Sequence, residues 1–261
     1  MTYRALITDF DGCLVGSELA VTPRVRQAIE TIRGNAHVSL ATGRILEGTV
    51  QRVINDIPLR SLHILHGGSV IYDSKTSRIV WQVTIPSDAV TAVLNLALTY
   101  RLPVHAFENG ISYTNDQGAW DDTLNYRPLD ELPNQMVTKI VLRTGQSVNR
   151  AKKIERDVLR QFPGVRAVCW YAPHWNRQAG VDVTAATKLE GVHQYMKLLN
   201  ITSEEIIAVG DSYNDFPLLM AAGVKVAMGN AVKELKDIAD YVAPSFENDG
   251  LAWVIEKFFI K

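Results

Sequence analysis

Two aspartates one residue apart stand at the end of an apolar segment near the N-terminus. In YRALITDFDGCL, residues 3–14, Asp9 and Asp11 alternate with Phe10, so an extended chain would direct both carboxylates to the same side. Like charges this close repel each other, and Asp is also a common turn residue. A simple turn after a strand therefore competes with a second interpretation, in which a cation or a reaction needs both groups.

Three further groups of polar residues stand where predicted strands end or predicted helices begin. They are Thr42, Gly43 and Arg44 in LATGR, Lys188 in TKLEG, and Asp211, Asn214 and Asp215 in VGDSYND. In open α/β sheets, ligands bind in the crevice outside the carboxyl ends of the strands. Several polar groups at one sheet edge indicate a site more strongly than any one of them alone.

Two of these residues also have a purely structural interpretation. Thr187 and Glu190 form a capping-box pattern around Lys188, which places this cation in a first helical turn, where the helix dipole disfavours it. Most lysines are solvated surface residues, but a residue placed against its local preference is more often functional. Thr42 is predicted to cap the helix that follows it, and its hydroxyl at a helix N-terminus would also suit a phosphate.

A calcium loop is a further interpretation of DFDG, and the spacing excludes it. An EF-hand needs acids or amides at positions 1, 3 and 5, Gly at position 6 and Glu at position 12. Here the fifth position is Cys13 and the sixth is Leu14. Hard oxygen ligands from two distant segments suit Mg²⁺ bound together with a phosphate better than they suit a calcium cage.

The segments that carry these residues alternate between strand and helix patterns. RALITD, AHVSLAT and LHIL are predicted strands, and TPRVRQAIETIR and ILEGTVQRVINDI, residues 45–57, are the helices between them. The last third repeats this pattern with KLEGVHQYMKLL, EIIAVG, FPLLMAAG and VKVAMG. Such an alternation predicts a parallel sheet with helices on its faces.

The middle of the chain has a different pattern, in which hairpin-like segments mix with two helices. We therefore predict an α/β protein, with a Rossmann-like parallel-sheet core domain in two parts, residues 1–83 and 186–261. An inserted α+β domain is expected at residues 84–185.

The composition is that of an ordinary globular protein: of 261 residues, 47% are hydrophobic and 21% are charged, and the net charge is -1. No basic block indicates a nucleic-acid partner, and no apolar stretch approaches the roughly 20 residues that span a bilayer. The N-terminal segment reaches an acid before a signal-peptide core could form. Cys13 and Cys169 lack paired spacing, so we expect a cytoplasmic protein with no membrane or nucleic-acid partner, and with its oligomeric state left open.

Taken together, DFDGCL, ATGR, Lys188 and GDSYND resemble the four ordered motifs of the haloacid dehalogenase superfamily. The Cof-like phosphatase branch is the most similar, because its cap domain lies between the second and third motifs, and because VAMGNA and ADYVAPSFENDGLA also resemble that branch. The resemblance implies a Mg²⁺-dependent phosphatase that hydrolyses a small phosphorylated metabolite, with sugar phosphates as a candidate class.

The resemblance also implies a role for each motif residue. Asp9 would attack the phosphorus and become an aspartyl-phosphate, while Asp11 would protonate the leaving alcohol and then activate water. The phosphoryl oxygens would be held by Thr42, Gly43, Lys188 and Asn214. Mg²⁺ would be bound by Asp9, Asp11 through its backbone carbonyl, and Asp211, with Asp215 orienting these ligands or Lys188.

Other residues are weaker candidates for contacts with the substrate. These are Arg44, His66, Trp170, Tyr171, His174 and Arg177. His66 stands in LHGGS, where relatives often have Asn-Gly-Ala, and a turn-forming role is the simpler interpretation. At least half of the aromatic stretch CWYAPHWNRQAG is expected to pack the inserted domain's own sheet.

Cys13 departs from the motif, in which this position is usually Thr. It can simply fill a small buried space, or its thiol beside Mg²⁺ and Lys188 could be open to oxidation.

Two other functions fit the same motifs. A phosphomutase of the phosphomannomutase type shares the motif set and the location of the cap. A non-catalytic binding or regulatory protein would be expected to lose Asp9, Asp11 or Asp211, and all three are present.

Overall fold

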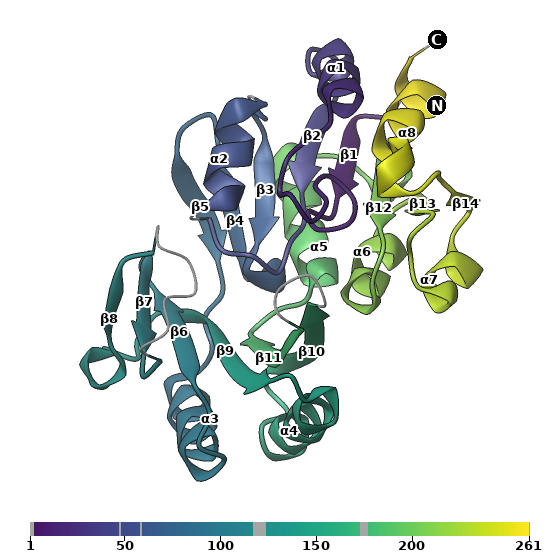
Figure 1. Cartoon of the computed structure of the whole chain (residues 1–261). Helices are drawn as coiled ribbons and strands as arrows, with labels where there is room; N and C mark the ends of the chain where they lie inside the picture. Colours follow the sequence, from purple (N-terminus) through teal and green to yellow (C-terminus); the bar gives the residue numbers. More distant parts are fainter. Residues whose placement is uncertain (1–2, 47, 58, 117–123, 173–176, 261) are drawn as a thin grey trace. The chain divides into compact units, whose positions relative to one another are not determined.

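The structure is a computed structural model that describes residues 3–46, 48–57, 59–116, 124–172 and 177–260 (Figure 1). The chain divides into two compact units. The core unit comprises Met1–Trp81 and Lys188–Lys261, and the cap unit comprises Gln82–Thr187. The unit boundaries thus fall after residues 81 and 187, where the sequence predicted residues 83 and 185.

A parallel five-stranded sheet forms the centre of the core unit, in the order β14-β13-β12-β1-β2. The strands are β1 (Ala5–Thr8), β2 (His37–Leu40), β12 (Ile206–Gly210), β13 (Val224–Ala227) and β14 (Tyr241–Val242). All residues of β1 and β12 are buried, as expected of parallel strands that are covered on both faces.

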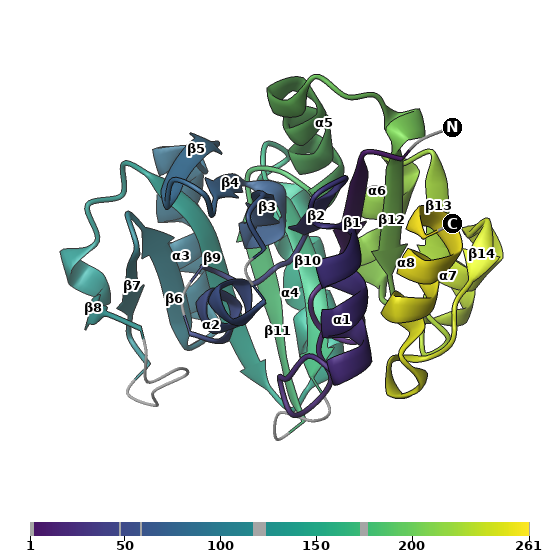
Figure 2. The ribbon, with the colours of Figure 1, turned by 90° about the horizontal axis from the view of Figure 1, so that it is seen from above.

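Helices lie on both faces of this sheet: Figure 2 shows α5 on one side and α1 and α8 on the other. The helices of the core unit are α1 (Pro23–Ile32), α2 (Thr49–Asp56), α5 (Lys188–Leu199), α6 (Phe216–Met220), α7 (Lys233–Ile238) and α8 (Gly250–Phe259). At the start of α1, the Thr22 hydroxyl accepts a hydrogen bond from the Val25 N–H and Pro23 occupies the first turn, as the sequence predicts.

Strand β3 (Leu62–Leu65) extends the core beyond β2 through a parallel bridge between Ala41 and Ile64. It also pairs antiparallel with β4 (Val70–Asp73), and together with β5 (Arg78–Gln82) they form a three-stranded sheet. The sequence predicted β3, but it did not predict β4 and β5.

Helix α2 is shorter than predicted. The sequence favoured a helix over residues 45–57, whereas α2 begins at Thr49 behind an N-cap at Gly48, whose φ is 61°. The prediction that Thr42 caps this helix is therefore wrong, because six residues separate Thr42 from Thr49. Gly48 takes that place because a positive φ costs glycine little.

The cap unit is a six-stranded sheet with two helices, α3 (Ser87–Thr99) and α4 (Val148–Gln161), on one of its faces (Figure 1). Its strand order is β10-β11-β9-β6-β7-β8, and only the β7–β8 pair is parallel. The strands are β6 (Val104–Glu108), β7 (Ile111–Thr114), β8 (Tyr126–Pro128), β9 (Val137–Gly145), β10 (Arg166–Ala172) and β11 (Gln178–Thr184). The two units have separate hydrophobic cores, and the predicted fold class is confirmed.

Within the described ranges, no helix is long and apolar enough to cross a membrane. Cys13 and Cys169 are both free thiols.

Candidate active site

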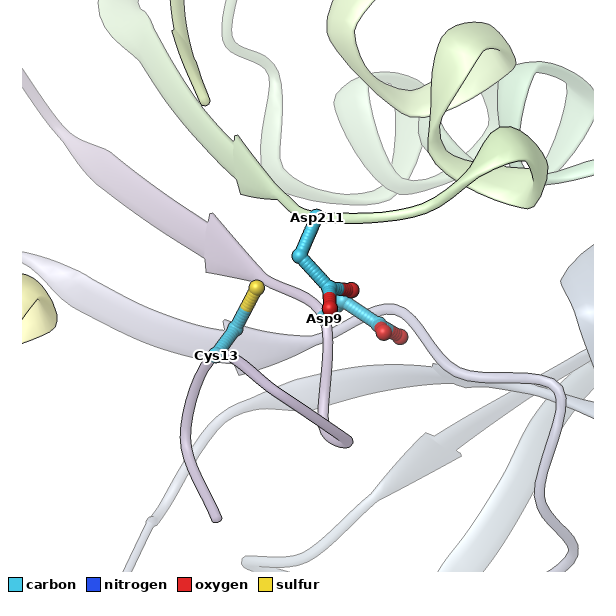
Figure 3. A group of neighbouring side chains, drawn as sticks. All are labelled: Asp9, Cys13 and Asp211. Carbon is cyan, nitrogen blue, oxygen red and sulfur yellow. The ribbon is translucent and has the colours of Figure 1, made fainter. Parts of the chain in front are cut away.

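Asp9 and Asp211 lie side by side because they follow neighbouring parallel strands. Thr8 at the end of β1 is in register with Val209 near the end of β12, and the Asp9 N–H donates to the Val209 carbonyl over 2.9 Å. Figure 3 shows the carboxylates of Asp9 and Asp211 close together, with the thiol of Cys13 beside them. The carboxyl ends of β1 and β12 thus carry two acids and a thiol, as the predicted sheet-edge site requires.

Lys188 bridges two buried carboxylates. Its Nζ lies 2.7 Å from Asp9 Oδ1 and 2.6 Å from Asp215 Oδ1, and the Lys188 side chain is only 3% exposed. Burial alone would lower the pKa of Lys188, but the carboxylates of Asp215 and Asp9 more than offset this, so the pKa lies above its ordinary value. Lys188 is therefore a permanent cation, and the interpretation of a solvated surface lysine is wrong.

The Asp215 side chain is fixed by the backbone that follows β12. Its Oδ2 accepts hydrogen bonds from the N–H groups of Asp211 (2.9 Å) and Ser212 (3.0 Å), which leaves Oδ1 for Lys188. A Cβ at Gly210 would lie 2.5 Å from the Asp215 side chain, so only glycine allows this approach. Asp215 thus positions Lys188 against Asp9.

The acids of this site have raised pKa values. Burial and the Asp215 charge raise the pKa of Asp9 to about 7, although Lys188 acts in the opposite direction. Burial, together with Asp9 and Asp215, raises the pKa of Asp211 to about 8. One lysine does not neutralise this group of carboxylates, and a bound cation would favour their ionised forms.

The residues around Asp211 fit a divalent metal ion. Asp9, Cys13 and Asp211 each offer a ligand atom, and these atoms lie within 4.8 Å of one another. Asn214 Oδ1 is buried and has no hydrogen-bond partner among the described residues. Gly12, at φ +74°, leaves room here, because a Cβ at this position would lie 2.2 Å from Asp211 Oδ2. Among the three grouped ligand atoms, the carboxylate oxygens of Asp9 and Asp211 are of the kind that Mg²⁺ prefers, and the Cys13 thiol is not.

Asp11 faces a different cation from Asp9. The guanidinium of Arg44 donates from Nε to Asp11 Oδ2 and from Nη2 to Asp11 Oδ1, each over 2.8 Å. The guanidinium carbon also lies 5.4 Å from the centre of the Phe10 ring. The sequence made Arg44 a candidate for substrate contact and did not predict its ion pair with Asp11.

The segment after β2 is held to the turn after β3. Thr42 is 1% exposed, and its hydroxyl accepts from the Arg44 N–H over 3.0 Å. The N–H of His66 donates to the Arg44 carbonyl (3.0 Å), and that of Gly67 donates to the Thr42 carbonyl (2.9 Å). His66 therefore takes part in a turn, as its simpler interpretation predicted, and it adopts a left-handed φ of 53°. Gly43 lies between the two anchored residues.

Asn230 is a site residue that sequence reasoning missed. Its amide donates to the Gly12 carbonyl over 3.0 Å and to Asp211 Oδ2 over 3.3 Å, while its carbonyl oxygen accepts from the Phe246 N–H. It ties the loop after β1 to Asp211. The sequence did indicate the segment that contains it, because VAMGNA contributes to the family resemblance, but no role was assigned to any residue of that segment.

The candidates in the cap unit do not share one face. Trp170 and Tyr171 are consecutive residues of β10, so their side chains point to opposite faces of the sheet. Trp170 lies across from Gly180, where a Cβ would be 2.4 Å from the indole, and Arg177 Nε lies 3.5 Å from the Tyr171 hydroxyl. Trp170 and Tyr171 therefore cannot both contact a substrate from the same face of this sheet. His174 lies outside the described residues.

Comparison with known proteins assigns the family. The model of the haloacid dehalogenase-like hydrolases matches residues 6–255. The chain belongs to the haloacid dehalogenase-like hydrolase family. It is 26% identical to the Bacillus subtilis (strain 168) protein named "Putative phosphatase YxeH", over 99% of both chains. It is 25% identical to the 5-amino-6-(5-phospho-D-ribitylamino)uracil phosphatase YcsE of the same organism, over 98% of this chain and 96% of the relative.

Solved structures of this hydrolase family have the same fold. The haloacid dehalogenase subclass IIB sugar phosphatase BT4131 superimposes with a TM-score of 0.83 at 24% identity, over 99% of this chain and 100% of that chain. A haloacid dehalogenase-like hydrolase from Bacteroides thetaiotaomicron gives 0.81 at 20% identity, over 99% and 100%. The predicted family and the predicted class of enzyme, a hydrolase, are confirmed.

Proposed function

We propose that the protein is a Mg²⁺-dependent phosphatase that hydrolyses a small phosphomonoester through an aspartyl-phosphate on Asp9. The observation that carries the proposal is the buried arrangement in which Lys188 contacts Asp9 and is itself held by Asp215. A carboxylate beside a fixed cation can accept a phosphoryl group whose charge that cation offsets. The phosphatase relatives support the reaction, and the name of the BT4131 structure makes sugar phosphates a candidate substrate class.

In the first step, a carboxylate oxygen of Asp9 attacks the phosphorus and forms a phosphorus–oxygen bond. The bond from phosphorus to the substrate oxygen breaks, its electron pair passes to that oxygen, and Asp11 supplies the proton that makes it an alcohol. Lys188 offsets the charge that gathers between Asp9 and the phosphoryl group, and Thr42, Gly43 and Asn214 are the further candidates to hold the phosphoryl oxygens.

In the second step, a water molecule attacks the phosphorus of the aspartyl-phosphate and gives a proton to Asp11. The bond between phosphorus and the Asp9 oxygen breaks and the Asp9 carboxylate is restored, so that inorganic phosphate and the alcohol are the products. Asp11 is protonated again at the end of the cycle.

Asp9, Asp211 and the backbone carbonyl of Asp11 are the proposed ligands of Mg²⁺, which when bound offsets the charge of the carboxylates and the phosphoryl group. Asn230 and Asp215 hold the surroundings of these ligands in place. The two free thiols accord with a reducing compartment such as the cytoplasm.

The experiment is release of inorganic phosphate from 4-nitrophenyl phosphate and from a panel of phosphorylated metabolites, with Mg²⁺ and with EDTA. We expect release that depends on Mg²⁺ and that Asp9→Asn abolishes while its circular dichroism spectrum stays unchanged. Asp237→Asn, in an exposed helical ion pair with Lys233, is the matched control and should stay active. Full turnover by Asp9→Asn would contradict the mechanism, and transfer of phosphate within one sugar instead of release would favour a phosphomutase.

A further inference from the structure

Arg44 takes no part in the steps above, yet its guanidinium makes two hydrogen bonds to Asp11. We propose that Arg44 is a positioning residue for Asp11, which fixes the direction in which its carboxyl group faces the leaving group. This inference rests on the proposed function, because it gives a role in protonating the leaving group to a residue outside that mechanism.

The geometry of the pair suits an orienting role. The two bonds, Nε to Oδ2 and Nη2 to Oδ1, are both 2.8 Å long and join a planar guanidinium to a planar carboxylate. An aspartate carboxyl group otherwise rotates freely over a broad range about its terminal torsion. Two parallel bonds fix that rotation, which a single bond from a lysine would leave open.

Arg44 is itself held on three sides. Its guanidinium lies over the ring of Phe10, which is fully buried, at 5.4 Å from the ring centre. Its N–H donates to the Thr42 hydroxyl, and its carbonyl accepts from the His66 N–H, each over 3.0 Å. The backbone of Arg44 is thus held at two points and its guanidinium is packed on Phe10, so Arg44 can hold Asp11 in a fixed position.

The side chains of Arg44 and Asp11 are 35% and 39% exposed, so solvent screens the attraction between their charges, and the orientation of the two groups is the distinctive feature of the pair. The two acids of DFDG have separate cations, Lys188 for Asp9 and Arg44 for Asp11. Lys188 faces the carboxylate that attacks the phosphorus, and Arg44 faces the carboxyl group that transfers the proton.

The test compares two substrates that differ in their need for an acid. The nitrophenolate leaving group of 4-nitrophenyl phosphate is stable as an anion, whereas an alkoxide, as from a simple alkyl or sugar phosphate, needs a proton as it departs. Because kcat/KM reports the steps up to the first irreversible one, it isolates cleavage of the bond to the leaving group from the later attack of water.

We expect Arg44→Gln to lower kcat/KM for an alkyl phosphate about 10- to 100-fold, which is part of the total effect of a general acid, and for 4-nitrophenyl phosphate less than about 3-fold. Arg44→Lys should fall between Arg44→Gln and the parent protein for the alkyl phosphate, since it keeps the charge and loses the second bond. In an Asp11→Asn background, Arg44→Gln should not change the ratio between the two substrates further, because the group that it positions is already gone.

Arg24→Gln is the matched control. Arg24 makes the same two-bond contact with Glu256, from Nε over 3.2 Å and from Nη2 over 2.8 Å, on helices α1 and α8. It should leave kcat/KM for both substrates unchanged. Equal losses for both substrates in Arg44→Gln would overturn the inference and make Arg44 a phosphoryl-binding or structural residue, and no loss for either would overturn it as well. A parent protein that hydrolyses neither substrate would instead refute the proposed function.

Discussion

Replacing Lys188 by methionine keeps an unbranched side chain of similar length and removes the ammonium group between Asp9 and Asp215. The ammonium lies 2.7 Å from Asp9 Oδ1 and 2.6 Å from Asp215 Oδ1, and the side chains of the three residues are 3%, 6% and 0% exposed. Removal of one partner from a buried ion pair costs about 3–5 kcal/mol, because the remaining charge stays buried without compensation.

Two features of the site place Lys188→Met at the lower end of this range. Asp215 keeps its hydrogen bonds from the N–H groups of Asp211 and Ser212, and Asp9, whose pKa is already raised, can take up a proton. We therefore expect the free energy of unfolding to fall by about 3 kcal/mol at pH 7, with complete loss of phosphatase activity. Because folded proteins are stable by about 5–15 kcal/mol, the variant should still fold.

The assay is equilibrium urea unfolding followed by far-UV circular dichroism, in a buffer that contains EDTA. The control is Lys233→Met, whose ion pair with Asp237 is exposed, and it should leave the midpoint unchanged. Lys188→Met combined with Asp215→Asn should recover part of the loss, because the buried charge of Asp215 is removed. If Lys188→Met were as stable as Lys233→Met, Lys188 would not be the buried bridge on which the site depends.

Three further predictions follow from buried or crowded residues. Gly12→Ala places a Cβ 2.2 Å from Asp211 Oδ2 at a φ of +74°, so the Mg²⁺ concentration for half-maximal activity should rise at least about 10-fold. The control is Gly34→Ala, where nothing lies within 4 Å of the added Cβ. An unchanged Mg²⁺ dependence in Gly12→Ala would contradict the proposed metal site. Burial lowers the pKa of His63 from 6.5 to about 4, despite opposing effects of its hydrogen bond to a backbone carbonyl and of a nearby acid, so the unfolded chain takes up the proton first. The contribution of His63 is the stability of the parent protein relative to His63→Gln in urea unfolding, and it should be about 2 kcal/mol lower at pH 5 than at pH 7. A difference between the two proteins that is the same at both pH values would contradict the shift. The thiol of Cys13 is fully buried, and burial and the neighbouring carboxylates raise its pKa. It should therefore resist iodoacetamide in the native protein and react after denaturation. Rapid alkylation of the native protein would contradict this and favour an oxidation-sensitive thiol.

The parallel core was predictable because its signals are local. Apolar runs such as Ala5–Thr8 mark buried strands, and the Thr22-Pro23 pair marks the start of α1. The order of the strands brings Asp9 and Asp211 together, so the positions of these acids followed from the sheet-edge rule.

The parts that the sequence did not reveal depend on contacts between distant segments. Strands β4 and β5 follow a turn at His66–Gly68, and the sequence predicted no strand after that turn. Their place in one sheet with β3 is a contact between segments that no local sequence pattern indicates. The ion pair between Arg44 and Asp11 joins the loop after β1 to the segment that precedes α2. Periodicity predicted that a helix begins at residue 45, directly after Arg44, whereas α2 begins at Thr49. The opposite directions of Trp170 and Tyr171, by contrast, follow from the alternation of side chains along any strand and could have been predicted.

The central claim is that Asp9 becomes covalently phosphorylated, and chemical trapping tests it directly. The parent protein is mixed with a substrate that it hydrolyses, quenched in acid within one turnover, and digested, and the peptide that contains Asp9 is analysed by mass spectrometry. An acyl phosphate is stable in acid and reacts with hydroxylamine, so we predict a phosphate adduct on Asp9 that hydroxylamine removes and that is missing in Asp9→Asn. Turnover without any adduct on Asp9, or a phosphate adduct on a different residue, would contradict the mechanism.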